Sequence, residues 1–199
     1  DEAHARRRPR EEAAEEYWTD TPAARASLPI HPVDALRLAV LAQRENMPEP
    51  AASRDPALGS ALIERIEAWL VERQSSGSGV PVSLGSSELG ALLSPSKAAA
   101  VEVIETVCTR GAGSPALPPV IRALFNGLRT PLLRLALRSD TLLSLERHPA
   151  LSLLDRIANI GRTLAPDSPP DLPVCRGLAS MVRSLGRLPR PTRRDFEMA

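Results

Sequence analysis

The chain has 199 residues, a net charge of +1, 43% hydrophobic residues and 3% aromatic residues. This length fits one domain or a part of a larger protein, and the near-neutral charge gives no general attraction to nucleic acid or to anionic membranes. Because no run of about 18 apolar residues is present, the sequence predicts neither a membrane-spanning helix nor a membrane partner.

Residues 1–29 are predicted to be a charged arm followed by a proline-containing linker. The first residues are too charged for a secretory signal, so we expect a cytoplasmic location. Cys108 and Cys175 stand outside any CxxC pair and within apolar helical patterns, which favours two buried free thiols in a reducing compartment. The chain starts at Asp1, and we expect it to be a piece of a longer bacterial protein.

Residues 30–188 are predicted to form a helical domain, because apolar residues recur there every three or four positions. Asp55-Pro56 and Ser94-Pro95 each combine a good N-cap with a proline at the first helical position. The apolar patterns that follow predict helices over residues 33–45, 56–74, 88–93 and 95–113. Gly111 and Gly113 are predicted to end the last of these.

Residues 117–161 contain the longest helical period, with leucines and Ile121 on one face and Ser114 as the expected N-cap. Pro131 falls inside this pattern and predicts a kink or a break, since proline removes a hydrogen-bond donor. His148-Pro149 opens a second helix that Gly161 is expected to end. Two apolar helices with a short connection predict an antiparallel pair.

Residues 165–173 contain four prolines and predict an irregular connection, after which a last helix covers residues 174–188. Residues 189–199 read as a polar, frayed tail that continues into a longer parent chain. The predicted fold is therefore all-α: an irregular helical bundle of six to eight helices with proline-rich connections.

Three segments between Val101 and Ile160 carry a family resemblance: VEVIETVCTRG, LPPVIRALFNGLRTPLLRLAL and HPALSLLDRIANIG. They resemble an uncharacterised proteobacterial domain-of-unknown-function family whose long members are often labelled "thymidine phosphorylase". The resemblance implies a helical fold and a bacterial context, and it implies no site residues. The label itself finds no support, because the chain lacks a glycine-rich anion loop with basic partners.

The sequence contains no motif for a nucleophile, a metal site or a cofactor. Three histidines and two cysteines are scattered, and His31 and His148 read as helix-entry residues before proline. Many acidic residues stand at positions predicted to be solvated, among them Glu64, Glu67, Glu72, Glu102 and Glu105. We therefore expect no catalytic residue, no metal and no cofactor, and a protein that is not an enzyme.

Arginine provides nearly all of the positive charge, because Lys97 is the only lysine. Four arginines are predicted on the central helix opposite its leucine face: Arg122, Arg129, Arg134 and Arg138. They read either as a solvated face or as a candidate partner surface for acidic protein or RNA backbone. Arg190 and Arg194 have an RxxxR spacing that resembles the arginine motif of cyclic-di-GMP-binding PilZ domains.

The sequence thus favours a non-catalytic scaffold or protein-interaction module, with protein as the expected partner. The alternative is a protein that binds nucleic acid, or one linked to a nucleotide second messenger, through arginine-bearing surfaces. Partner capture from the native host and salt-dependent nucleic-acid binding distinguish the two.

Overall fold

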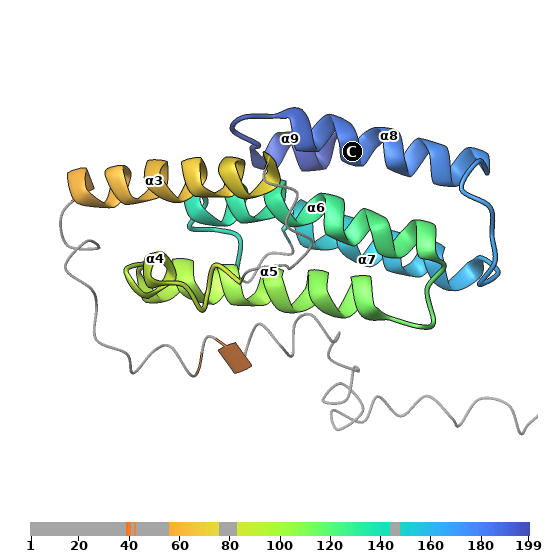
Figure 1. The fold of residues 1–199 in the computed structure, drawn as a ribbon, viewed down its shortest axis with the longest axis horizontal. Helices are drawn as coiled ribbons and strands as arrows, with labels where there is room; N and C mark the ends of the chain where they lie inside the picture. The colour runs from red at the N-terminus through yellow and green to blue at the C-terminus, as the bar shows by residue number, and fades with distance from the viewer. Residues whose placement is uncertain (1–38, 41, 43–55, 76–82, 144–147) are drawn as a thin grey trace, which may run out of the picture. The chain divides into compact units, whose positions relative to one another are not determined.

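The computed structural model describes residues 39, 40, 42, 56–75, 83–143 and 148–199, which all lie within the unit of residues 32–199. In these residues every regular element is a helix, and seven helices have defined bounds (Figure 1). They are α3 (Pro56–Ser75), α4 (Glu88–Ala91), α5 (Pro95–Gly113), α6 (Pro119–Arg138), α7 (Pro149–Thr163), α8 (Pro173–Arg187) and α9 (Arg193–Glu197). The predicted all-α bundle of six to eight helices is confirmed. No helix in the described ranges has the length and apolar character needed to cross a bilayer.

Proline marks the start of most of these helices. The helices that begin at a proline are α3, α5, α6, α7 and α8. Proline suits this position because its missing N–H would have no intrahelical partner there and its φ angle is already helical. Side chains cap several starts as well: the Ser87 hydroxyl accepts from the backbone of Gly90, and that of Ser94 accepts from Lys97. The predicted starts of α3, α4 and α5 are therefore confirmed.

Two local predictions in the central stretch were wrong, and of the kink or break predicted at Pro131 only the break is excluded. Ser114 caps the C-terminus of α5, and α6 begins only after Pro118. α6 runs as one helix through Pro131, whose ring is buried, so the helix does not break there, and the kink stays a prediction. Gly161 lies inside α7, because its missing side chain makes room for Leu117 and Ile121.

Helix α6 is the hub of the described bundle, as the long apolar period predicted. It contacts α3, α5, α7 and α8, and its contact with α5 is the most extensive. Its buried apolar residues include Ile121, Leu124, Leu128, Leu132 and Leu135. Gly161 near the end of α7 meets Ile121 near the start of α6, so the two helices run antiparallel, as predicted.

The C-terminal residues depart from the frayed tail that we expected. α9 follows the turn after α8, and Thr192 and Asp195 form a capping box at its start. Phe196 is 2% exposed and belongs to the main apolar core. At the other end, residues 39, 40 and 42 are helical, while the rest of the helix predicted over 33–45 lies outside the described residues.

Candidate functional site

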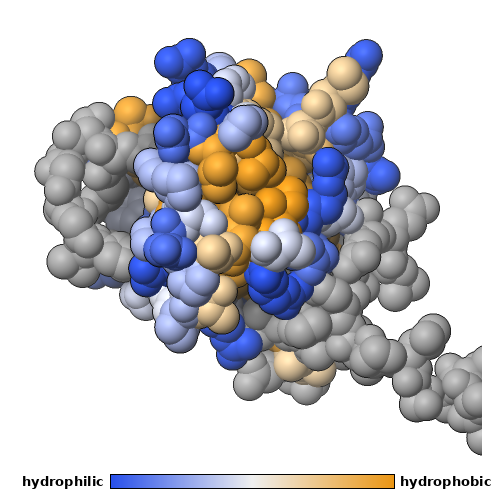
Figure 2. Space-filling view, turned by 90° about the vertical axis from the view of Figure 1, so that its right-hand side faces the viewer, coloured by the Kyte–Doolittle hydropathy of each residue, from blue (hydrophilic) through white to orange (hydrophobic). Residues whose placement is uncertain are grey.

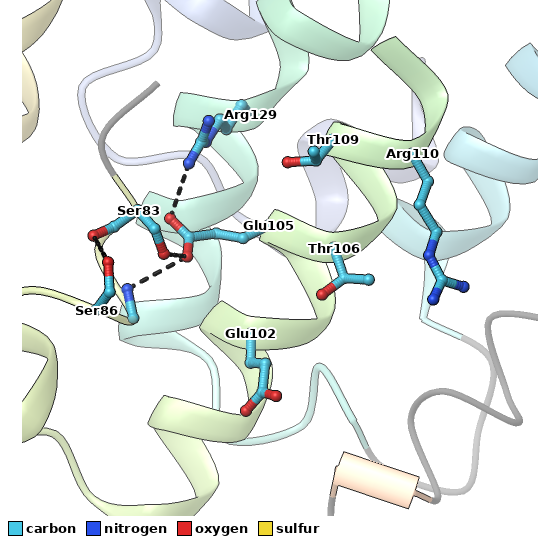
Figure 3. Close-up of a pocket in the computed structure, with 9 residues that line it drawn as sticks. Ser83, Ser86, Glu102, Glu105, Thr106, Thr109, Arg110 and Arg129 are labelled. Carbon is cyan, nitrogen blue, oxygen red and sulfur yellow. Dashed lines mark hydrogen bonds and ion pairs between the residues drawn. The ribbon is translucent and has the colours of Figure 1, made fainter. Parts of the chain in front are cut away.

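An open cleft of about 630 Å³ lies where the segment before α4 meets α5 and α6 (Figure 3). Side chains with hydroxyl, carboxylate and guanidinium groups line it. The lining residues are Ser83, Gly85, Ser86, Glu102, Glu105, Thr106, Thr109, Arg110 and Arg129. No histidine or cysteine is among them, so the chemistry of the described wall rests on acids, arginines and hydroxyls.

Glu105 of α5 is the centre of the cleft and is only 7% exposed. Its Oε1 accepts from the backbone N–H of Leu84 at 2.7 Å and from Nη2 of Arg129 at 3.0 Å. Its Oε2 accepts from the backbone N–H of Gly85 at 3.2 Å and from the Ser83 hydroxyl. One carboxylate thus holds the segment before α4 against both α5 and α6.

These hydrogen bonds give Glu105 a structural role. Burying a carboxylate is costly unless it is paired and hydrogen-bonded, and here one charged and three neutral donors satisfy it. Both oxygens are already accepting hydrogen bonds, so the group is committed to the fold. The cluster gives no positive sign of acid–base or nucleophilic catalysis.

The prediction that Glu105 is solvated was wrong, and the sequence held a signal for its burial. Glu105 stands four residues after Val101 and three before Cys108, and both of those residues are buried. Residues at these spacings share one helix face. The acid was therefore inside the apolar face of α5, where a polar side chain needs partners from elsewhere in the chain.

The far wall of the cleft is more open. Thr109 and Arg110 are exposed, Thr106 is half-buried, and Arg110 points away from the Glu105–Arg129 pair (Figure 3). Glu102 lies one turn before Thr106 on the same helix. These groups offer hydrogen-bond donors and acceptors to whatever enters, without the convergence on one point that a small-molecule site requires.

The structure does not bring the four arginines predicted as a partner surface onto one face. Arg129 lies in the cleft, paired with Glu105. Arg138 makes two hydrogen bonds to Glu67 of α3, at 2.6 Å and 2.5 Å, and this carboxylate raises the arginine's pKa.

The remaining two arginines are partly or fully buried. Arg134 is 7% exposed and donates to the backbone carbonyl of Leu188 at 3.2 Å, so its predicted solvated position was wrong. Arg122 is half-buried, and its Nε has no hydrogen-bond partner within the described part of the chain. The four side chains thus have different surroundings. Arg129 and Arg138 pair with glutamates of α5 and α3, Arg134 contacts a carbonyl at the end of α8, and Arg122 is half-buried.

Neither thiol is placed for chemistry. Cys108 and Cys175 are free and buried, as predicted. Burial raises the pKa of Cys108 to about 12, an effect that the positive charge of Arg129 only partly opposes. A thiol with such a pKa is almost entirely protonated at neutral pH and is a poor nucleophile. Within the described ranges no group of three or more His, Cys, Asp or Glu residues converges to hold a metal ion.

A second surface lies at the end of the bundle where α6 begins, α7 ends and α8 begins. Figure 2 shows apolar side chains gathered in the middle of this end, with charged residues around them. Among the residues at these helix ends, Val174 at the start of α8 is 40% exposed, while Val120 at the start of α6 and Leu164 just after α7 are partly buried against the core. We refer to Val120, Leu164 and Val174 as the apolar end patch.

Comparison with known proteins gives one positive result. The family model described as "Protein of unknown function (DUF1631) 2nd domain" matches residues 34–189. This range includes the segments between Val101 and Ile160 that carried the resemblance. No curated protein and no solved structure matches the chain.

Proposed function

The chain belongs to the family described as the second domain of DUF1631 proteins of unknown function, and on this premise we propose that it is a scaffold or protein-interaction module. The expected membership in a domain-of-unknown-function family is thereby confirmed. In this proposal the module is part of a larger bacterial cytoplasmic protein, and its partner is a protein. The fold supports the proposal in a general way, because α6 contacts α3, α5, α7 and α8 and so joins the described helices into one bundle.

The apolar end patch is the observation that carries the proposal. Apolar surface surrounded by polar and charged residues is typical of protein–protein interaction sites. Val174 is the exposed member, and Val120 of α6 and the residue after α7, Leu164, are partly buried. In this proposal the three helix ends together supply the apolar surface seen in Figure 2, which a partner would bury.

The test is partner capture with matched variants. Val174→Asp places a charge on the exposed member of the apolar end patch without removing a core residue, so we expect it to abolish capture of the native partner from host extract. Leu58→Asp is the control, because Leu58 is 55% exposed on α3, away from the patch. The proposal is wrong if no partner is captured by the unmodified chain, or if both variants capture it equally.

Nucleic-acid or second-messenger binding through Arg122, Arg129, Arg134 and Arg138 remains the alternative, with less support. The arginines that pair with Glu105 and Glu67 are already neutralised within the fold, and a bound phosphate would have to displace those carboxylates. Salt-dependent binding that is lost in Arg122→Gln and Arg129→Gln would favour this alternative over the protein-interaction module.

A further inference from the structure

Helix α8 carries a row of exposed arginines along one face, whereas the arginines of α6 do not share one face. Arg176, Arg183 and Arg187 are all exposed and follow one another at spacings of seven and four residues. At 3.6 residues per turn these positions lie within about 40° of each other around the helix axis. We call these three residues the arginine stripe. Arg190 is also exposed and continues the positive charge just beyond the helix.

Within the described part of the chain, the arginine stripe forms no ion pair. α8 contains no Asp or Glu. No carboxylate of the described ranges lies within ion-pair distance of the stripe, whereas Arg129 and Arg138 of α6 are each paired with a glutamate. Three guanidinium groups therefore face solvent side by side, repelling one another, with their hydrogen-bond donors open to an outside acceptor.

We propose that the arginine stripe binds the phosphate backbone of a nucleic acid. Guanidinium groups match phosphate oxygens in geometry and charge, and each can form two parallel hydrogen bonds to one phosphate. Along the helix axis the stripe spans 11 residues, or roughly 16 Å at 1.5 Å per residue. That length lets successive guanidinium groups contact different phosphates of one strand or of one groove edge.

The composition of α8 between the arginines favours a nucleic acid over a protein partner. The exposed residues between the arginines are small: Gly177, Ser180 and Ser184. A protein interface normally buries aromatic or large apolar anchors at its centre, and the stripe has none. Small residues instead let a backbone approach the helix closely. Because the stripe has no aromatic group that could stack on bases, we expect it to bind phosphates without preference for a base sequence.

An anionic membrane fits the stripe less well. A helix that binds membranes inserts its apolar face among the lipids. Apart from Val174 at its start, the apolar face of α8 is turned into the bundle, since Cys175, Val182 and Leu185 are buried and Val182 packs against Gly127 of α6. Only electrostatic adhesion through the arginines would remain.

The experiment measures binding of a short mixed-sequence DNA duplex and of a single-stranded RNA by fluorescence anisotropy over a series of salt concentrations. The stripe variant carries Arg176→Gln, Arg183→Gln and Arg187→Gln. Its matched control carries the same change at three arginines that are exposed on α3 and α7: Arg65, Arg156 and Arg162. Both variants lower the net charge by the same amount, and circular dichroism checks that both remain helical.

The unmodified chain should bind at least one of the two nucleic acids, with an affinity that falls as salt rises. The plot of log affinity against log salt has a negative slope. In the stripe variant this slope should become less steep by about three, one for each lost phosphate contact, and the control should keep its slope. Equal weakening of both variants would show general charge attraction only and would overturn the proposal. Absence of binding at low salt, or binding to phosphatidylserine vesicles or polyglutamate as tight as to nucleic acid, would overturn it as well.

Discussion

At the scale of single residues, His148 combines a structural role with a titratable group. Its Nδ1 accepts a hydrogen bond from the backbone N–H of Ala150 at 3.2 Å and so caps α7. The side chain is 1% exposed, and its Nε2 has no partner among the residues that the structure describes. Burial, reinforced by the positive charge of Arg193 and opposed by Glu197, lowers the pKa of His148 below 6.5.

This lowered pKa predicts a loss of stability in mild acid. Since the unfolded chain binds the proton at a higher pH than the folded chain, the neutral histidine contributes its full stability above pH 6.5, and that contribution is lost as the pH falls from 6.5 through the folded pKa. Protonated imidazole also cannot accept at Nδ1, so the cap is lost. Urea unfolding over a pH series should show a steeper fall for the unmodified chain than for His148→Asn, which keeps a capping oxygen but does not titrate. Parallel curves for the two proteins would contradict the prediction.

Residues with purely local roles were the ones that sequence reasoning could assign. The Ser94 cap and the proline starts of α3, α5 and α7 follow from backbone chemistry within four residues, and they were predicted. The partners of Glu105 come from residues 20 to 24 positions away, so its role depends on tertiary packing that no local pattern encodes. Arg134 illustrates the same limit, because its acceptor belongs to Leu188 at the end of α8.

At the scale of the element, glycines that looked like helix terminators serve close packing. α5 runs past Gly111, and a Cβ at this position would overlap the ring of Phe125 on α6. Gly161 and Gly127 likewise face α6–α7 and α6–α8 contacts, with neighbouring carbon atoms 2.8 Å from the position of a Cβ. A glycine near the end of an apolar pattern can therefore either end its helix or make room for a neighbouring helix. Only the position of the neighbouring helix shows which role it has.

Two alanine substitutions test the packing role of Gly111, because they should change the free energy of unfolding in opposite directions. Gly111→Ala should destabilise the fold by about 1–3 kcal/mol, because the rigid ring of Phe125 must move. Gly177→Ala is the matched change in α8, where no atom beyond the adjoining residues and nearby backbone of the same helix lies within 4 Å of the added Cβ, and it should stabilise the fold by about 0.5–1 kcal/mol. Chemical denaturation measures both free energies of unfolding. A shift of the same sign in both variants would show that packing at Gly111 is not the cause.

At the scale of the whole molecule, the described helices share one main core that extends to the C-terminal end of the chain. That core takes residues from α3, α5, α6, α7 and α8, together with Phe196 of α9. The all-α class and the central position of residues 117–161 were predictable, because helical periodicity is a local signal summed over many residues. The docking of α9 was not predictable, since a single phenylalanine in a polar segment carries no period.

The burial of Phe196 therefore provides the sharpest test of the assembled fold. Phe196→Ala should lower the free energy of unfolding by about 3–5 kcal/mol, because it removes a ring that is 2% exposed and leaves a cavity between α9 and the core. Met198→Ala, two residues further on, removes a side chain that is 81% exposed and should change stability by less than about 0.5 kcal/mol. Urea denaturation followed by circular dichroism compares the two. If the tail were frayed, both substitutions would be nearly neutral; a loss confined to Phe196→Ala would show that α9 is an integral part of the bundle.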